Sequence, residues 1–233
     1  MCVELKPRWD LSNHDALALL PINSGITQQF MPCIHKFAND LNLERIDFEP
    51  TILIVGTFNP GWNNLGNYAQ WFYGRTNNNY FWDVLPRLYE NSNLRLVPCA
   101  EWKAFCSHHK IALTDLIYSI DDADSDNQTH INQLKNYRDD AIARHFHRFT
   151  LVDIPAILEN HPTITHAYLT RQTSANFWQQ KWLPIVQYCN ENGIKTQILL
   201  TPSGSARFQM PKSTDITLRD FIFKRWQNSW HSL

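Results

Sequence analysis

The feature that most constrains the fold of this chain is a set of four short, largely apolar runs. They span residues 51–55, 111–116, 165–169 and 196–200. Apolar runs without strict alternation are typical of strands that are buried on both faces, and segments with helical periodicity separate these runs. Strands that alternate with helices form a parallel sheet covered by helices. The sequence therefore predicts an α/β protein, a three-layer α/β/α sandwich around a central, mainly parallel four-stranded sheet.

The segments between and after these strands show helical periodicity, at 80–89, 137–146, 154–160, 174–192 and 218–230. The polar and acidic stretch 119–133 is predicted to be a surface loop. Apolar positions in residues 1–48 recur at helical spacing, which predicts a helical N-terminal extension. We therefore expect two parts, the extension at 1–48 and an α/β/α domain at 49–233.

Composition narrows the class of protein. At 233 residues and 43% hydrophobic content the chain can bury a substantial core. The first ten residues lack the apolar stretch of a signal peptide, and no apolar run reaches the roughly 18 residues that would cross a membrane. Five scattered cysteines without a C-x-x-C pair favour a reducing compartment and argue against a zinc site. We expect a cytoplasmic protein with no membrane association.

Side chains suited to holding a ligand cluster after the predicted strands, where open parallel sheets bind their ligands. The first strand is followed by the turn Asn59-Pro60-Gly61, and later by the aromatic pair Phe72-Tyr73 and by Asn79. The second strand ends in Thr114-Asp115, and the last is followed by residues 201–207. Aromatic rings beside side-chain amides and a turn with exposed N–H groups suit a flat, neutral, hydrogen-bonding ring such as a nucleobase.

These motifs, taken together with their order along the chain, match a pattern known from other proteins. They read Asn59-Pro60-Gly61, Phe72-Tyr73, Asn79-Tyr80-Phe81-Trp82, Ile111-Ala112-Leu113-Thr114-Asp115 and Pro202-Ser203-Gly204-Ser205-Ala206-Arg207. The arrangement resembles the uracil-DNA glycosylase superfamily, and most closely its mismatch-specific uracil/thymine and hypoxanthine-type branches. The resemblance covers residues 51–208, and the shared order makes the set more specific than any single motif.

The resemblance implies a DNA glycosylase that hydrolyses the N-glycosidic bond of uracil or a related deaminated base in DNA, as in base excision repair. Its partner would be DNA, reached by base flipping, and we expect a monomer without a cofactor. Because no lysine lies within the motifs to form a Schiff base, the expected enzyme is monofunctional, with water as the nucleophile.

The resemblance also implies roles for individual residues. Asn59 is expected to hold the attacking water, with Asn79 as the alternative catalytic residue. The residues expected to bind the base are Gly56, Thr57, Phe58, Phe72 and Tyr73. The residues expected to contact DNA are Ser203, Gly204, Ser205 and Arg207. Two departures from the family pattern bear on these roles: one extra residue lies between Gly56 and Asn59, and Thr201 stands where relatives carry Asn or His.

Other interpretations of the same residues stay open. Asn59-Pro60-Gly61 can be a tight turn alone, because each of its residues favours one. Tyr73 can belong to the core instead of stacking on a ligand. A catalytically inactive nucleic-acid-binding protein on the glycosylase fold fits the net charge of −1, which argues against extensive wrapping of DNA. A nucleoside hydrolase-like enzyme could use the same kind of pocket.

Metal and nucleotide motifs are not expected. The stretch Asp122-x-Asp124-x-Asp126 begins like a calcium loop but lacks the required glycine and closing glutamate. The histidine spacings in His108-His109 and in 145–147 do not present two rings on one helical face. No P-loop or dinucleotide-binding glycine pattern occurs. We therefore predict no metal site.

Overall fold

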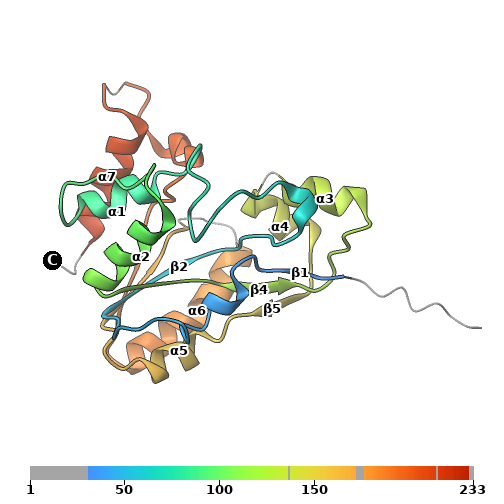
Figure 1. Cartoon of the computed structure of the whole chain (residues 1–233), viewed down its shortest axis with the longest axis horizontal. Helices are drawn as coiled ribbons and strands as arrows, with labels where there is room; N and C mark the ends of the chain where they lie inside the picture. Colours follow the sequence, from blue (N-terminus) through green and yellow to red (C-terminus); the bar gives the residue numbers. More distant parts are fainter. Residues whose placement is uncertain (1–30, 136, 172–175, 214, 231–233) are drawn as a thin grey trace, which may run out of the picture.

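The central sheet of the protein has four parallel strands (Figure 1). The computed structural model describes residues 31–135, 137–171, 176–213 and 215–230. The strands are β2 (Ile52–Gly56), β3 (Ile111–Asp115), β6 (His166–Leu169) and β7 (Lys195–Ile198), in the order β3-β2-β6-β7. Each neighbouring pair is parallel. The predicted four-stranded parallel sheet is confirmed.

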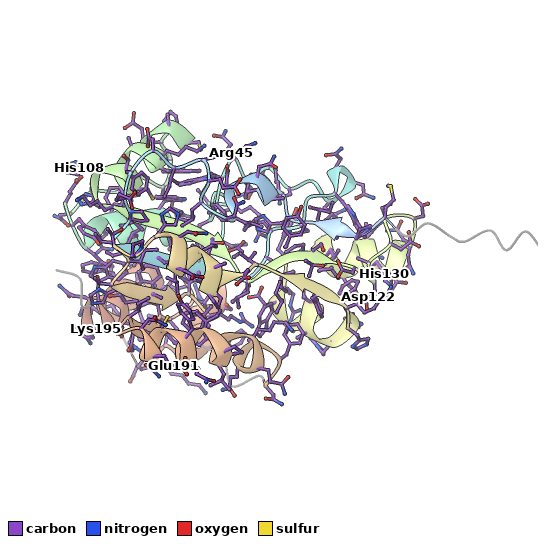
Figure 2. The ribbon with its side chains drawn as sticks, turned by 90° about the horizontal axis from the view of Figure 1, so that it is seen from below. Arg45, His108, Asp122, His130, Glu191 and Lys195 are labelled. Atoms are coloured by element: carbon purple, nitrogen blue, oxygen red, sulfur yellow. The ribbon has the colours of Figure 1, made fainter. Side chains whose placement is uncertain are left out.

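Two hydrophobic cores lie on the two faces of this sheet. In β2, Leu53 and Val55 belong to one core and Ile52 and Ile54 to the other, as the alternation of side chains along a strand requires. The first core is covered by α3 (Gln128–Lys135), α4 (Asp139–His145), α5 (Ile154–Asn160) and α6 (Asn176–Glu191); the second by α1 (Phe81–Arg87), α2 (Cys99–His108) and α7 (Leu218–Ser229). Figure 2 shows His108 at the end of α2 on one side and Glu191 at the end of α6 on the other. The predicted three-layer α/β/α arrangement is confirmed.

A second, antiparallel sheet extends the fold beyond the sequence prediction. It consists of β1 (Cys33–Ile34), β4 (Ile117–Ile120) and β5 (Phe149–Leu151), in the order β1-β4-β5. Only Leu116 separates β4 from β3, so one continuous stretch of chain joins the two sheets. Three short 3-10 helices complete the described elements: η1 (Ala38–Asp40), η2 (Asn63–Leu65) and η3 (Gly204–Gln209).

The five predicted helices are present as α1, α4, α5, α6 and α7. Their described ends differ from the predicted ones by at most two residues. The predicted start of α6, at residue 174, lies outside the described residues. None of the helices in the described part of the chain combines the length and the apolar character that crossing a membrane requires.

The helical prediction for residues 31–48 is wrong. These residues form β1 and η1 and contain no α-helix. Their apolar side chains do not share one buried face, because Leu41 is buried while Ile34 is 44% exposed on the small sheet. Residues 1–30 lie outside the described part of the chain, and the division at residue 48 stays a prediction.

The prediction of a surface loop at 119–133 is also wrong at both ends. β4 continues to Ile120 and α3 begins at Gln128, and Ala123 between them is fully buried. The polar residues here shape the backbone. The Asp124 carboxylate accepts a hydrogen bond from the Asp126 N–H at 3.0 Å, as short polar side chains do in turns.

Candidate functional site

Loops from the carboxyl ends of all four parallel strands enclose one pocket, with a cavity volume of about 100 Å³. The residues that line it are Thr57, Phe58 and Asn59 after β2, Asp115 at the end of β3, Thr170 after β6, Thr201, Pro202 and Ser203 after β7, and Tyr73, Arg75, Asn79, Tyr137 and Asp139 from other loops and from the start of α4. Larger hollows lie elsewhere, but this pocket lies at the sheet edge where ligands bind in open parallel sheets.

Gly56 ends β2 beneath the pocket and makes the close packing there possible. A Cβ atom at this position would lie 2.0 Å from Asp115 Oδ1 and 2.8 Å from the Tyr73 hydroxyl. Only a residue without a side chain lets both groups approach the backbone this closely.

Asp115 is buried, with 2% of its surface exposed, and is held by two donors. His35 Nε2 lies 2.7 Å from Asp115 Oδ2, and Asn59 Nδ2 donates to the same oxygen at 3.2 Å. His35 Nδ1 accepts a hydrogen bond from the Phe37 N–H at 3.0 Å, so the network assigns the ring proton to Nε2, which donates to the carboxylate. The amide nitrogen of Asn59 is therefore engaged with Asp115.

Tyr73 forms an aromatic wall of the pocket. Its ring stacks on Phe81 with centroids 3.7 Å apart and an interplanar angle of 4°, and its hydroxyl lies 2.8 Å from Thr170 Oγ1. Burial raises the pKa of this phenol well above its usual range. Phe72, the other half of the predicted aromatic pair, is only 1% exposed and packs against Phe37 in the core. Tyr73, and not Phe72, therefore lines the pocket.

Asn79 lies where two loops meet. It forms an isolated antiparallel bridge with Ser203, and the neighbouring Tyr80 N–H donates to the Pro202 carbonyl at 2.6 Å. The side-chain Oδ1 of Asn79 accepts a hydrogen bond from the Phe81 N–H at 2.9 Å, at the start of α1. The amide oxygen of Asn79 is thus engaged in the local backbone.

Arg95 holds the loop that leads to Asn79. Its Nε donates to the carbonyls of Thr76 at 2.8 Å and of Asn79 at 3.1 Å, and its guanidinium carbon lies 4.7 Å from the centre of the Tyr80 ring. One charged side chain therefore fixes the backbone on this side of the pocket.

Asp139, at the start of α4, adds a second carboxylate to the pocket. Its Oδ1 accepts a hydrogen bond from the Thr57 hydroxyl at 2.8 Å, and its Oδ2 lies 3.1 Å from Arg171 Nη1. Burial raises the pKa of this carboxyl above the usual value of 3.8, while Arg171 and the Thr57 hydroxyl act in the opposite direction. A partly buried carboxyl with a raised pKa in a pocket is a common feature of functional sites.

Arg75 brings a cation to the same pocket. Its guanidinium carbon lies 3.8 Å from the centre of the Tyr137 ring, within the range of a cation–π contact. Burial lowers the pKa of Arg75, but a guanidinium stays charged under all ordinary conditions. The pocket therefore combines one aromatic wall, several hydroxyls and amides, two carboxylates and a guanidinium.

The last predicted loop forms η3 beside the pocket. Ser203 lines the pocket, and its hydroxyl lies 3.1 Å from that of Thr201 and 2.8 Å from that of Ser205. Arg207 is exposed, and the next residue, Phe208, is 93% exposed. An exposed phenylalanine next to a cation, in the short helix that follows the pocket-lining Ser203, is available to contact a partner.

The structure brings together most residues predicted for the site. Six of them line the pocket: Thr57, Phe58, Asn59, Tyr73, Asn79 and Ser203. Gly56 lies beneath it, and Gly204, Ser205 and Arg207 belong to η3 at its side. Phe72 is in the core. The roles of these residues stay predictions.

Three residues of the site carry no clear signal in the sequence. His35 lies in a segment expected to be helical, and Tyr137 and Asp139 begin a predicted helix. An aspartate in the first turn of a helix stabilises the helix dipole. The position of Asp139 in the sequence therefore does not distinguish a site residue from a residue that only stabilises the helix. Thr170 and Thr201, by contrast, could be placed near the site because both follow predicted strands.

One group of potential metal ligands occurs in the described residues, at Glu90, His108 and His109, whose ligand atoms lie within 4.8 Å of one another. α2 ends at His108, so His109 lies beyond the helix. Adjacent residues within one helix point in different directions, but this pair does not lie within one helix. His109 Nε2 lies 2.7 Å from Glu90 Oε1, and this contact satisfies both groups without an ion.

Comparisons with known proteins support the fold. No protein-family model and no curated protein matches the sequence. Among solved structures, the chain is similar to the solution NMR structure of a proposed uracil DNA glycosylase from Methanosarcina acetivorans, with 16% sequence identity and a TM-score of 0.50. The similarity covers 78% of this chain and 92% of that chain. The likeness is one of fold, and that fold is the one the sequence resemblance implies.

Proposed function

We propose that this protein is a DNA glycosylase that hydrolyses the N-glycosidic bond of uracil or a related deaminated base in DNA. The observation that carries the proposal is the convergence of Asn59, Tyr73, Asn79 and Ser203 on one pocket at the carboxyl edge of the sheet. These residues come from four separate motifs, which the resemblance expects to form one base-excision site together.

The chemistry of the pocket suits an extruded base. Its hydroxyl, amide and guanidinium groups can hydrogen-bond the edge of a base, and Tyr73 supplies an aromatic surface. Cleavage of the glycosidic bond leaves negative charge on the departing base. Donors such as the Arg75 guanidinium stabilise that charge most effectively where water is excluded.

The exposed side chains of η3 suit contact with a duplex that has one base removed from the stack. Phe208 is 93% exposed, and an apolar side chain of this size can enter a base stack as a wedge. Arg207 beside it can neutralise a phosphate. The net charge of −1 fits such a local contact better than extensive wrapping of DNA.

The direct test is incubation of excess protein with duplexes that contain uracil, hypoxanthine, xanthine or a G·T mismatch, followed by mass spectrometry of free bases. Release of at least one base is expected, together with an abasic site that remains uncut until alkali is added. If no base is released from any of the four duplexes, the enzymatic proposal is wrong.

One observation favours a second function, that of a DNA-binding protein without catalysis. The chain departs from the family pattern at the residue expected to hold water, because one extra residue separates Gly56 from Asn59. A non-catalytic protein would bind the uracil duplex and release nothing from it.

Parallel incubation with deoxyuridine distinguishes a nucleoside hydrolase from a DNA glycosylase. A nucleoside hydrolase would release uracil from the nucleoside at least as fast as from DNA.

A further inference from the structure

We propose that Asp139, and neither Asn59 nor Asn79, activates the attacking water in this pocket. This inference rests on the proposed glycosylase function and names the group that carries its chemistry. Three features of the described residues support it: the two asparagines are amides, which are too weakly basic to take a proton from water, the other carboxylate is enclosed, and Asp139 is attached to the turn after β2.

Asn59 is held by contacts at the end of the turn that follows Gly56. The turn runs Gly56-Thr57-Phe58-Asn59, and its last side chain donates to Asp115 Oδ2 at 3.2 Å. Asn59 is 8% exposed, and its backbone carbonyl accepts the Lys36 N–H at 2.8 Å. These contacts fix Asn59 beside Asp115, and its amide is too weak a base to take a proton from water at neutral pH.

Asn79 is engaged on its other side. Its amide oxygen accepts the Phe81 N–H at 2.9 Å, which fixes the orientation of the amide at the start of α1. An amide is also a weak base that does not take a proton from water at neutral pH. Asn79 therefore fits a role in contacting the base better than one in generating the nucleophile.

Of the two carboxylates in the pocket, Asp139 is the accessible one. Asp115 is 2% exposed, with Oδ2 bound by His35 and Asn59 and Oδ1 packed against Gly56. The Asp139 side chain retains 18% exposure, and among the described residues each of its oxygens has one hydrogen-bond or ion-pair partner. A carboxylate oxygen can accept more than one hydrogen bond, so Asp139 can also hold water.

Thr57 attaches Asp139 to the turn that follows β2. The Thr57 hydroxyl donates to Asp139 Oδ1 at 2.8 Å, although the two residues are 82 positions apart. Thr57 immediately follows Gly56, so this carboxylate lies beside the turn where the family resemblance predicts the water-holding group. A carboxylate from α4 thus occupies the neighbourhood that the sequence assigned to an asparagine.

The proposed step is balanced without a cofactor. Asp139 accepts a proton from water while the water oxygen forms a bond to C1′ of the sugar. The C1′–N bond breaks, and its electron pair leaves with the base. The proton on Asp139 then passes to the departed base or to solvent, which regenerates the carboxylate. The products are the free base and an abasic sugar.

The pH dependence follows from the groups around Asp139. They are Thr57, Arg171, Arg75 and Asp115, and the burial of Asp139 raises its pKa above 3.8. A base must be deprotonated to act, so the rate should rise with pH and level off above the pKa of Asp139. Removing the Thr57 hydroxyl removes an interaction that lowers this pKa, and should move the rise to higher pH.

The experiment measures single-turnover release of uracil from a duplex between pH 4 and 9, for the native protein, Asp139→Asn and Thr57→Val. Asp139→Asn should be about 10²- to 10⁴-fold slower, the usual contribution of a general base, and should lose the acidic limb of the profile. Binding to a duplex with an uncleavable 2′-fluorouridine should stay within threefold. Thr57→Val should shift the midpoint of the limb upward.

The outcomes separate this inference from the proposed function. If the native protein releases uracil while Asp139→Asn keeps both the rate and the acidic limb, the inference is overturned and the glycosylase function stands. The inference is also overturned if the acidic limb of the Thr57→Val profile has the same midpoint as that of the native protein. This second variant gives a result even if Asp139→Asn fails to fold. If the native protein releases no base from any duplex, both are overturned.

Discussion

At the scale of single residues, the site depends on how one buried charge is accommodated. Asp115 lies at the end of β3 with 2% of its surface exposed, and a buried carboxylate requires donors to offset the loss of water. His35 and Asn59 provide them from positions 80 and 56 residues away. Gly56 provides the space, since any side chain there would overlap Asp115 Oδ1.

The substitution Gly56→Ala tests this packing. The new Cβ would lie 2.0 Å from Asp115 Oδ1, and Asp115 cannot rotate away without losing its bonds to His35 and Asn59. We expect a loss of about 1–3 kcal/mol in the free energy of unfolding, the usual cost of overpacking, measured by urea denaturation.

Gly204→Ala is the matched control for this substitution. A Cβ atom added at Gly204 would meet no other atom within 4 Å, so the change in the free energy of unfolding should stay within about 0.5 kcal/mol. Equal stability of Gly56→Ala and the native protein would show that Asp115 is not confined by Gly56.

At the scale of elements, β1 connects the chain before residue 48 to the site. It pairs with β4 through Cys33 and Ile34, and the next residue, His35, reaches Asp115. The same short segment therefore completes the small antiparallel sheet and supplies a donor to the larger one. Two-residue strands leave almost no periodic signal, which explains why the sequence pattern favoured a helix instead.

His35→Ala tests the contribution of this segment. The substitution removes one of the two donors to a buried carboxylate, so we expect a loss of about 1–3 kcal/mol in the free energy of unfolding, measured by thermal or urea denaturation. His35→Gln keeps a side-chain donor and should recover part of that loss.

Ile34→Thr is the control in the same strand. It changes β1 at a position that is 44% exposed and should change the free energy of unfolding by less than about 0.5 kcal/mol. A His35→Ala protein as stable as the native one would show that Asp115 needs no donor from β1.

At the scale of the whole molecule, the sequence predicts the frame better than the site. The four central strands and five helices follow from apolar periodicity, because strands such as β2 are buried on both faces. The pocket edge follows too, since ligands bind where parallel strands end. Asn59, Tyr73, Asn79 and Ser203 were predicted from motifs and do line one pocket.

What the sequence could not predict are contacts between residues far apart in the chain. The bonds of His35 to Asp115 and of Thr57 to Asp139 join residues 80 and 82 positions apart. No local pattern records such a pairing. Asp139 also has an ordinary local explanation as an acidic residue in the first turn of a helix. Phe72 shows the converse, since its motif suggested a ligand contact and its burial places it in the core.

Ser203 lines the pocket, and the exposed Arg207 and Phe208 follow it in η3. Base flipping into this pocket can be observed directly in a crystal structure of the protein bound to a duplex that carries one uncleavable 2′-fluorouridine. We predict that this base lies in the pocket between Tyr73, Asn79 and Ser203, with its sugar facing Asp139. A base that stays stacked in the duplex, or DNA bound to another face of the molecule, would contradict the proposed function.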